Sequence, residues 1–208
     1  MNRVTPKSAV GFLTALLLMA GAARATAAAP SAAMSDPRYE HVLGSPKAKV
    51  TVIEYASVGC PHCAVWAQTV FPQFKARFID TGKVRFVFRE MITGDSELAV
   101  AGFLVANCAP ADRFFPFVDA VFADQAGVAE GGGTALYKVA KEQTGMSVDA
   151  FSACLTNDRE LKDLETNTNA LAEANGIQAT PTFVINGRKV EGDQSLESLA
   201  EEITRARH

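Results

Sequence analysis

A Cys-Pro-His-Cys motif at residues 60–63 constrains this chain more than any other feature of its sequence. A β-branched and aromatic run at residues 50–55 precedes the motif and predicts a buried strand. Apolar residues at helical spacing follow it and predict a helix that begins near His62. A dithiol at such a strand-to-helix junction is typical of a redox pair rather than of a structural crosslink.

The position of the motif also predicts a reactive sulfur. If Cys60 caps the helix, Pro61 takes the first helical position, where its missing N–H and fixed φ are tolerated. The free N–H groups of His62 and Cys63 then point back at the Cys60 sulfur, and the helix dipole adds partial positive charge there. His62 is also a titratable neighbour that can become cationic. We therefore expect a depressed Cys60 pKa and an oxidising disulfide, because a stabilised thiolate is a good leaving group.

Residues 1–27 have the pattern of a secretory signal peptide. The basic residues Arg3 and Lys7 precede a nearly uninterrupted apolar run at residues 9–20, and small residues suited to cleavage follow. The run is shorter than the roughly 20 apolar residues that a membrane-spanning helix needs. We expect cleavage near residues 25–29, which leaves a soluble, exported protein of one domain or of one domain with an insertion.

The net charge expected for the mature protein bears on whether it binds nucleic acid. The chain has 20 basic and 23 acidic residues. Removing the signal peptide removes three of the basic residues (Arg3, Lys7 and Arg24) and none of the acidic ones, so 17 basic and 23 acidic residues remain. The resulting net charge of −6 argues against nucleic acid as a partner.

Strand and helix patterns follow one another in a definite order after the motif. Residues 84–89 predict a second strand, and a block of helices with apolar stripes comes next. A glycine run at residues 131–133 is predicted to begin one of these helices. Strand signals return at residues 182–185, followed by an Asn-Gly hairpin turn at residues 186–187, and Ser195 caps a last helix.

This order of elements predicts the fold class. A β-α-β half, a helical block and a β-β-α half together indicate an α/β protein with a thioredoxin-like fold and an inserted helical domain. We expect the thioredoxin-like domain to be discontinuous, at residues 39–93 and 177–208. The helical insertion is expected at residues 94–176.

Three segments carry a resemblance to a known family. The first is Val-Ile-Glu-Tyr-Ala-Ser at residues 52–57, which runs into the Cys-Pro-His-Cys motif. The second is Gly-Lys-Val-Arg-Phe at residues 82–86, and the third is Ala-Thr-Pro-Thr-Phe-Val-Ile-Asn-Gly at residues 179–187. In these segments the chain resembles the DsbA family of periplasmic thiol-disulfide oxidoreductases, and in particular the short DsbA-like proteins of Gram-negative bacteria. With the helical insertion, the resemblance covers nearly all of the mature chain.

The resemblance implies roles for five residues. Cys60 matches the exposed nucleophile of the family, and Cys63 matches its buried resolving partner. Pro181 matches a cis-proline that lies against the active site and, with Thr180 before it, presents backbone to the bound substrate. Glu54 matches a buried acid that helps to move the proton of the resolving thiol. A strand carboxylate that faces water is the alternative interpretation of Glu54.

The two remaining cysteines are predicted to form a structural disulfide. Cys108 and Cys154 have no cysteine near them in the sequence, and both fall at the ends of predicted helices. A bond between them would close a loop of about 46 residues and stabilise the fold by ~4 kcal/mol. Two buried free thiols, or a second redox pair that modulates the first, are the alternatives. We expect neither a metal nor a bound cofactor, because the motif lacks two further zinc ligands and the cysteines themselves carry the electrons.

The expected function is that of a periplasmic protein-disulfide oxidase. It would donate the Cys60–Cys63 disulfide to unfolded exported proteins with free cysteines, and an inner-membrane oxidase of the DsbB type would restore it. We expect a monomer. A disulfide isomerase or reductase on the same fold is the first alternative, because Thr180 before the proline also occurs in isomerases. A periplasmic Cu(I)-binding protein is the second, since soft thiolates suit Cu(I).

Overall fold

The computed structural model describes residues 1–2 and 37–207. The predicted signal peptide at residues 1–27 and its cleavage site therefore lie outside the described residues, apart from the first two. Within the part of the chain that the structure describes, no helix combines the length and apolar character needed to cross a membrane.

A five-stranded mixed sheet with the strand order β1-β3-β2-β4-β5 forms the centre of the protein. The strands are β1 (His41–Gly44), β2 (Val50–Ala56), β3 (Val84–Glu90), β4 (Thr182–Ile185) and β5 (Arg188–Glu191). Strand β2 runs parallel to β3 and antiparallel to β4, so segments from both ends of the chain share one sheet. This arrangement confirms the predicted α/β class.

One face of the sheet is covered by the helices that flank the predicted active site. They are α1 (Pro61–Thr69), α2 (Phe71–Phe74), the π-helical turn η3 (Lys75–Ile79) and the C-terminal α8 (Leu196–Arg205). Because side chains alternate along a strand, Glu54 shares this face with Val52, which belongs to the same buried cluster as Phe74 and Leu199. The acid of β2 therefore points toward the motif helix.

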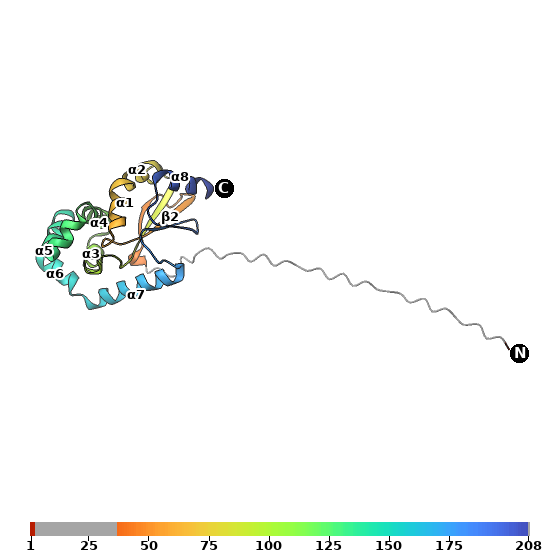
Figure 1. The fold of residues 1–208 in the computed structure, drawn as a ribbon. Coiled ribbons are helices and arrows are strands. Elements are labelled where there is room, and N and C mark those ends of the chain that lie inside the picture. The colour runs from red at the N-terminus through yellow and green to blue at the C-terminus, as the bar shows by residue number, and fades with distance from the viewer. Residues whose placement is uncertain (3–36, 208) are drawn as a thin grey trace.

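Five helices form a block between β3 and β4. They are α3 (Ser96–Cys108), α4 (Phe114–Ala123), α5 (Gln125–Thr144), α6 (Val148–Leu155) and α7 (Asp158–Asn175). Side-chain oxygens of Asp95, Ser147 and Asn157 accept N–H groups in the first turns of α3, α6 and α7, which satisfies donors that a helix start leaves free. In Figure 1, α3 to α6 gather beside the sheet, whereas α7 runs back along it.

The glycine run separates two helical segments of α5, so the predicted helix start at the run is confirmed. The first segment, which begins six residues earlier at Gln125, was not predicted. Gly132 has φ 53° and ψ −142°, which is not helical, and the helix therefore bends there. Only glycine adopts such a backbone conformation at little cost, because it has no Cβ.

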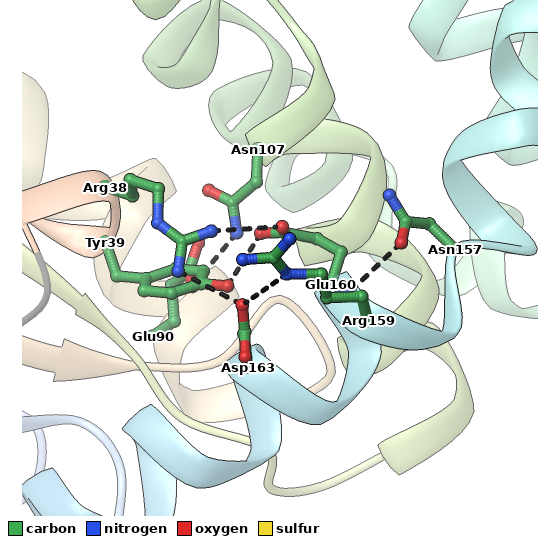
Figure 2. A network of polar contacts seen from close by, with 8 residues as sticks. All are labelled: Arg38, Tyr39, Glu90, Asn107, Asn157, Arg159, Glu160 and Asp163. Carbon is green, nitrogen blue, oxygen red and sulfur yellow. Dashed lines mark hydrogen bonds and ion pairs between the residues drawn. The ribbon is translucent and has the colours of Figure 1, made fainter.

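Helix α7 covers the opposite face of the sheet and contacts the segment before β1. Leu171 packs with Tyr55 and Val184 in a second buried cluster. At the other end of the helix, the Tyr39 hydroxyl donates to Glu160 at 2.7 Å, and Figure 2 shows this bond within a larger polar network. Figure 2 also shows Glu90 at the end of β3, which accepts a hydrogen bond from Asn107 of α3 at 3.3 Å. These contacts tie the segment before β1 to α7, and β3 to α3.

Candidate active site

The motif lies where β2 ends and α1 begins. Cys60 is the N-cap residue with φ −94° and ψ 118°, and Pro61 is the first residue of the helix, as the sequence predicted. The Cys60 N–H donates to Ser57 O at 3.1 Å, and the Ala64 N–H donates to Cys60 O at 3.1 Å. The Cys60 sulfur therefore lies at the positive end of the helix, near the backbone N–H groups of His62 and Cys63.

Cys60 has a strongly lowered pKa. It falls from 9.0 to about 5, chiefly because the Cys63 thiol donates a hydrogen bond to the sulfur. A side-chain hydrogen bond with Thr180 and the backbone N–H groups of Cys63 and His62 act in the same direction, whereas burial opposes them. The backbone part of this explanation is the one that the sequence predicted. A pKa near 5 leaves Cys60 almost fully ionised at neutral pH.

The nucleophile is less exposed than its family role implied. Cys60 is only 6% exposed, and its sulfur lies 3.3 Å from the carbonyl oxygen of Thr180, to which the thiol form donates. Cys63 is not exposed at all. Both cysteines are unjoined thiols in this structure. Cys60 is therefore the sulfur with the greater access to a substrate.

Cys63 has a pKa that is shifted in the opposite direction. Burial raises it most, because a thiolate loses its hydration there, and the hydrogen bond to Cys60 and the charge of Glu54 raise it further. The two sulfurs of the motif are thus separated into an ionised and a protonated group. This division suits an attacking or leaving thiolate at Cys60 and a resolving thiol at Cys63.

Glu54 lies beneath this pair and is 3% exposed, which excludes the alternative of a strand carboxylate that faces water. Its pKa is raised well above 4.5, first by burial and then by the charges of Asp119 and Cys60. A carboxyl group with a raised pKa can hold a proton at neutral pH and release it when a neighbour needs one. The environment of Glu54 is therefore compatible with proton transfer to and from Cys63.

The loop before β4 brings the proline beside the motif. The Thr180–Pro181 peptide bond is cis. Antiparallel pairing of Tyr55 with Thr182 sets the loop next to the end of β2, and the Thr180 hydroxyl lies 2.7 Å from that of Thr93. The sheet thus places residues 180 and 60 together although 120 positions separate them in the sequence.

The structure places the His62 imidazole differently from the sequence prediction. The ring is 72% exposed, and its Nδ1 lies 2.8 Å from a carboxylate oxygen of Asp193. The hydrogen bond and the charge of Asp193 raise the pKa of His62, and the charge of Cys60 also raises it. The backbone N–H of His62 lowers the pKa of Cys60. The predicted effect of the imidazole on the Cys60 pKa stays a prediction.

Sequence reasoning missed two further residues of the site. Gln125, the first residue of α5, donates its Nε2 to Val58 O at 2.6 Å and to Cys60 O at 3.1 Å. Asp193, beyond β5, holds His62 as described above. No local pattern marks either residue, because both reach the motif through tertiary contacts over more than 60 positions. Trp66, one turn after Cys63, is 2% exposed, and its ring lies 4.8 Å from that of Phe183.

Cys108 and Cys154 form a disulfide in the structure. It connects the last residue of α3 with α6, and its Cα atoms lie 6.1 Å apart. Within the described ranges, 1–2 and 37–207, no group of three or more His, Cys, Asp or Glu side chains is arranged to hold a metal ion.

Comparison with known proteins decides the family. Residues 36–205 match the family described as Thioredoxin. The chain belongs to the thioredoxin family. The crystal structure of Wolbachia pipientis alpha-DsbA1 superimposes with a TM-score of 0.75 at 25% identity, over 86% of this chain and 96% of that one. The thioredoxin-like fold is thereby confirmed, and the chain is a DsbA-like member of its family.

Relatives in sequence are similar over the same region. A Rickettsia typhi protein assigned as a protein-disulfide oxidoreductase is 34% identical over 167 residues, which are 79% of this chain and 61% of that protein. The chain therefore spans about three fifths of the length of this relative. Disulfide bond formation protein D of Bacillus subtilis is 29% identical over 167 residues, which are 78% of this chain and 74% of that protein.

Proposed function

We propose that the protein is a periplasmic protein-disulfide oxidase that transfers its Cys60–Cys63 disulfide to folding exported proteins. The observation that carries the proposal is the Cys60 pKa of about 5. A thiolate that is stabilised in the folded protein favours the reduced state, so the disulfide form is a strong oxidant. The names of the relatives support disulfide chemistry in general, and this pKa supports the oxidising direction.

The transfer takes place in two exchange steps. A substrate thiolate attacks the Cys60 sulfur, which forms a mixed disulfide and releases Cys63 as a thiolate that takes a proton. A second substrate thiolate then attacks the substrate sulfur of the mixed disulfide and releases Cys60 as a thiolate. The substrate gains a disulfide and loses two electrons, and the Cys60–Cys63 pair gains them. The low Cys60 pKa speeds the second step because Cys60 is then the leaving group.

The other parts of the proposal follow from this cycle. Thr180 and Pro181 would present backbone to the substrate, because the cis bond lies beside the Cys60 sulfur. An inner-membrane oxidase of the DsbB type would accept the electrons and restore the disulfide, and no bound cofactor is required. We propose a monomer in which segments 39–93 and 177–208 carry the chemistry and segment 94–176 covers it through contacts such as that of Gln125 with Cys60.

The proposal is tested by mixing the oxidised protein with a reduced, unfolded protein that contains several cysteines. Cys60→Ala should lower the rate of substrate oxidation to that of the reaction without enzyme, and Cys63→Ala should accumulate mixed disulfides. The double variant Cys108→Ala/Cys154→Ala, which removes the other pair, is the matched control and should keep the activity. Oxidation by the Cys60→Ala variant at the normal rate would contradict the mechanism.

A second assay separates the oxidase from the isomerase or reductase alternative. A substrate with scrambled disulfides needs isomerisation, whereas a fully reduced substrate needs oxidation. We expect fast oxidation and slow isomerisation, because the reduced form that an isomerase uses attacks weakly when its thiolate is strongly stabilised. Efficient isomerisation with poor oxidation would reverse the assignment.

A further inference from the structure

The proposed cycle requires a proton at a place without direct contact to solvent. Cys63 must gain a proton when the disulfide opens and lose it when the disulfide forms again. Cys63 has no exposed surface, and Glu54, the acid beneath it, is 3% exposed. A proton that reaches Cys63 through Glu54 therefore needs a further carrier between Glu54 and water.

A small, partly open cavity lies between Glu54 and a second carboxyl group. The cavity has a volume of ≈ 10 Å³, measured as space for water centres, which is about the room that one water molecule needs. Glu54 of β2 and Asp119 of α4 both line it. The rest of its wall consists of apolar and aromatic side chains, namely Trp66, Ala67, Phe71, Phe86, Phe88, Phe115, Val118 and Phe122. One water in this cavity would have the two carboxyl groups as its polar side-chain partners.

The same aspartate also lines a hollow at the protein surface. This hollow measures ≈ 590 Å³, and it shares Phe71, Phe115 and Asp119 with the small cavity. These three side chains thus separate the inner cavity from the outer hollow. A phenylalanine cannot carry a proton, so Asp119 is the member of this group that can pass one across.

Charged and titratable groups from several elements surround the two acids. Glu40, His41, Lys75 and Asp112 line the outer hollow with Asp119, and Cys63 interacts with Glu54. Asp119 acts on Glu54 from α4, and Cys60 acts on it from the start of α1. From β3, Glu54 is paired with Phe88, which carries no charge. Asp119 is exposed at the surface of α4, where it can exchange protons with solvent. Desolvation by the neighbouring side chains still raises its pKa to about 6, and Lys75 of η3 opposes the shift. A carboxyl group that titrates near pH 6 can take up and release protons in neutral water.

We propose that Asp119 is the proton-uptake residue of the active site, which exchanges protons with solvent and with Glu54 through one water in the inner cavity. The proposal rests on the function given above and adds a step to it. When the disulfide opens, the Glu54 carboxyl group gives its proton to the Cys63 thiolate. Asp119 then gives a proton through the water to the Glu54 carboxylate and takes one from solvent. When the disulfide forms again, each transfer runs in reverse.

The test follows the closing of the disulfide, which requires Cys63 to lose its proton. Reduced protein is mixed with oxidised glutathione, and the fluorescence of Trp66, the one tryptophan of the chain, reports the step in which Cys63 displaces glutathione from Cys60. This assay needs no protein substrate. It therefore reports on the proton route even if the protein proves not to be an oxidase in the substrate assay.

Three variants give the decisive comparison. Asp119→Asn keeps the size of the side chain but cannot carry the proton, so the displacement step should slow by about tenfold and lose its dependence on pH near 6. Asp119→Glu should restore both the rate of the displacement step and its dependence on pH. Asp112→Asn is the matched control, because Asp112 lines the outer hollow but not the inner cavity. Melting temperatures and the Cys60 pKa should be unchanged in all three.

Two results would overturn the proposal. The first is an Asp119→Asn variant with the rate and the pH profile of the unmodified protein. The second is an equal loss of rate in Asp119→Asn and Asp112→Asn, which would assign the effect to the charge of the surface hollow rather than to proton transfer at Asp119.

Discussion

The two cysteine pairs of this protein differ in almost every physical respect. Cys60 and Cys63 are separated by two residues, lie at the start of a helix and are unjoined thiols. Cys108 and Cys154 are 46 positions apart and are joined between α3 and α6. A bond between near neighbours restricts the unfolded chain little, whereas a bond that closes a long loop restricts it strongly. Sequence separation alone therefore favours exchange chemistry at the first pair and stabilisation at the second.

The surroundings of the first pair extend this difference. Hydrogen bonds lower the pKa of Cys60 to about 5, whereas burial raises that of Cys63, so the two thiols differ in charge at neutral pH. Glu54 lies beneath them with a raised pKa. A redox pair therefore needs surroundings that ionise one sulfur and keep the other protonated, in addition to two nearby cysteines. A structural pair needs only two cysteines that the fold places within bonding distance.

The largest effect is expected from removing the long-range disulfide. Cys108→Ala/Cys154→Ala should lower the free energy of unfolding by about 4 kcal/mol, because the loop between α3 and α6 is no longer closed in the unfolded chain. Urea denaturation of the double variant and the unmodified protein measures the difference. If the Cys108–Cys154 pair instead modulates Cys60, the double variant will exchange with glutathione at a rate that differs severalfold from that of the unmodified protein. That result would contradict the division into one redox pair and one structural pair.

A smaller effect is expected from pH on the first pair. Folding lowers the Cys60 pKa from 9.0 to about 5, so the thiolate stabilises the reduced protein fully above pH 9, and this contribution is lost as the pH falls through 5. The excess melting temperature of the reduced over the oxidised form should therefore increase from pH 5 to pH 8. Reduced Cys60→Ser, whose hydroxyl does not titrate in this range, is the control. An oxidised form that is the more stable at pH 8 would contradict the expectation.

The smallest effect is expected at His62. Its ring is exposed and held by Asp193, and it contributes to the Cys60 thiolate through its backbone N–H. His62→Ala should therefore raise the Cys60 pKa less than Cys63→Ala does, because the latter removes the leading hydrogen bond. Alkylation rates as a function of pH measure both values. A larger shift in His62→Ala would return the imidazole to the role that the sequence suggested.

Much of the fold could be predicted because its signals are local. The runs at residues 50–55, 84–89 and 182–185 became β2, β3 and β4, each within one residue at either end. Strand β1 was not predicted, because its four residues include a glycine and show no clear alternation. The glycine run marks the break at Gly132 between two helical segments, as predicted, but the short segment that begins at Gln125 was not predicted. Propensity is a weak guide where tertiary packing decides the outcome.

The candidate site could be predicted only in part, for the same reason. Cys60 and Cys63 were marked by a motif that stands alone in the sequence, and Pro181 was identified through the resemblance to the DsbA family. Gln125, Asp193 and Asp119 carry no such mark, because each reaches the site through the packing of another element against α1 or β2. The direction of each pKa shift likewise depends on partners that only the folded chain brings together.

The central claim is that the fold separates the two sulfurs of the motif into a thiolate and a thiol, and one titration tests it directly. Thiolate absorbance of the reduced protein, followed from pH 3 to pH 10 with Cys60→Ser as the baseline, gives the Cys60 pKa. We predict a single transition at about pH 5 that is absent from the Cys60→Ser variant. A transition near the ordinary cysteine value of 9.0, or two thiols that ionise together, would contradict the account.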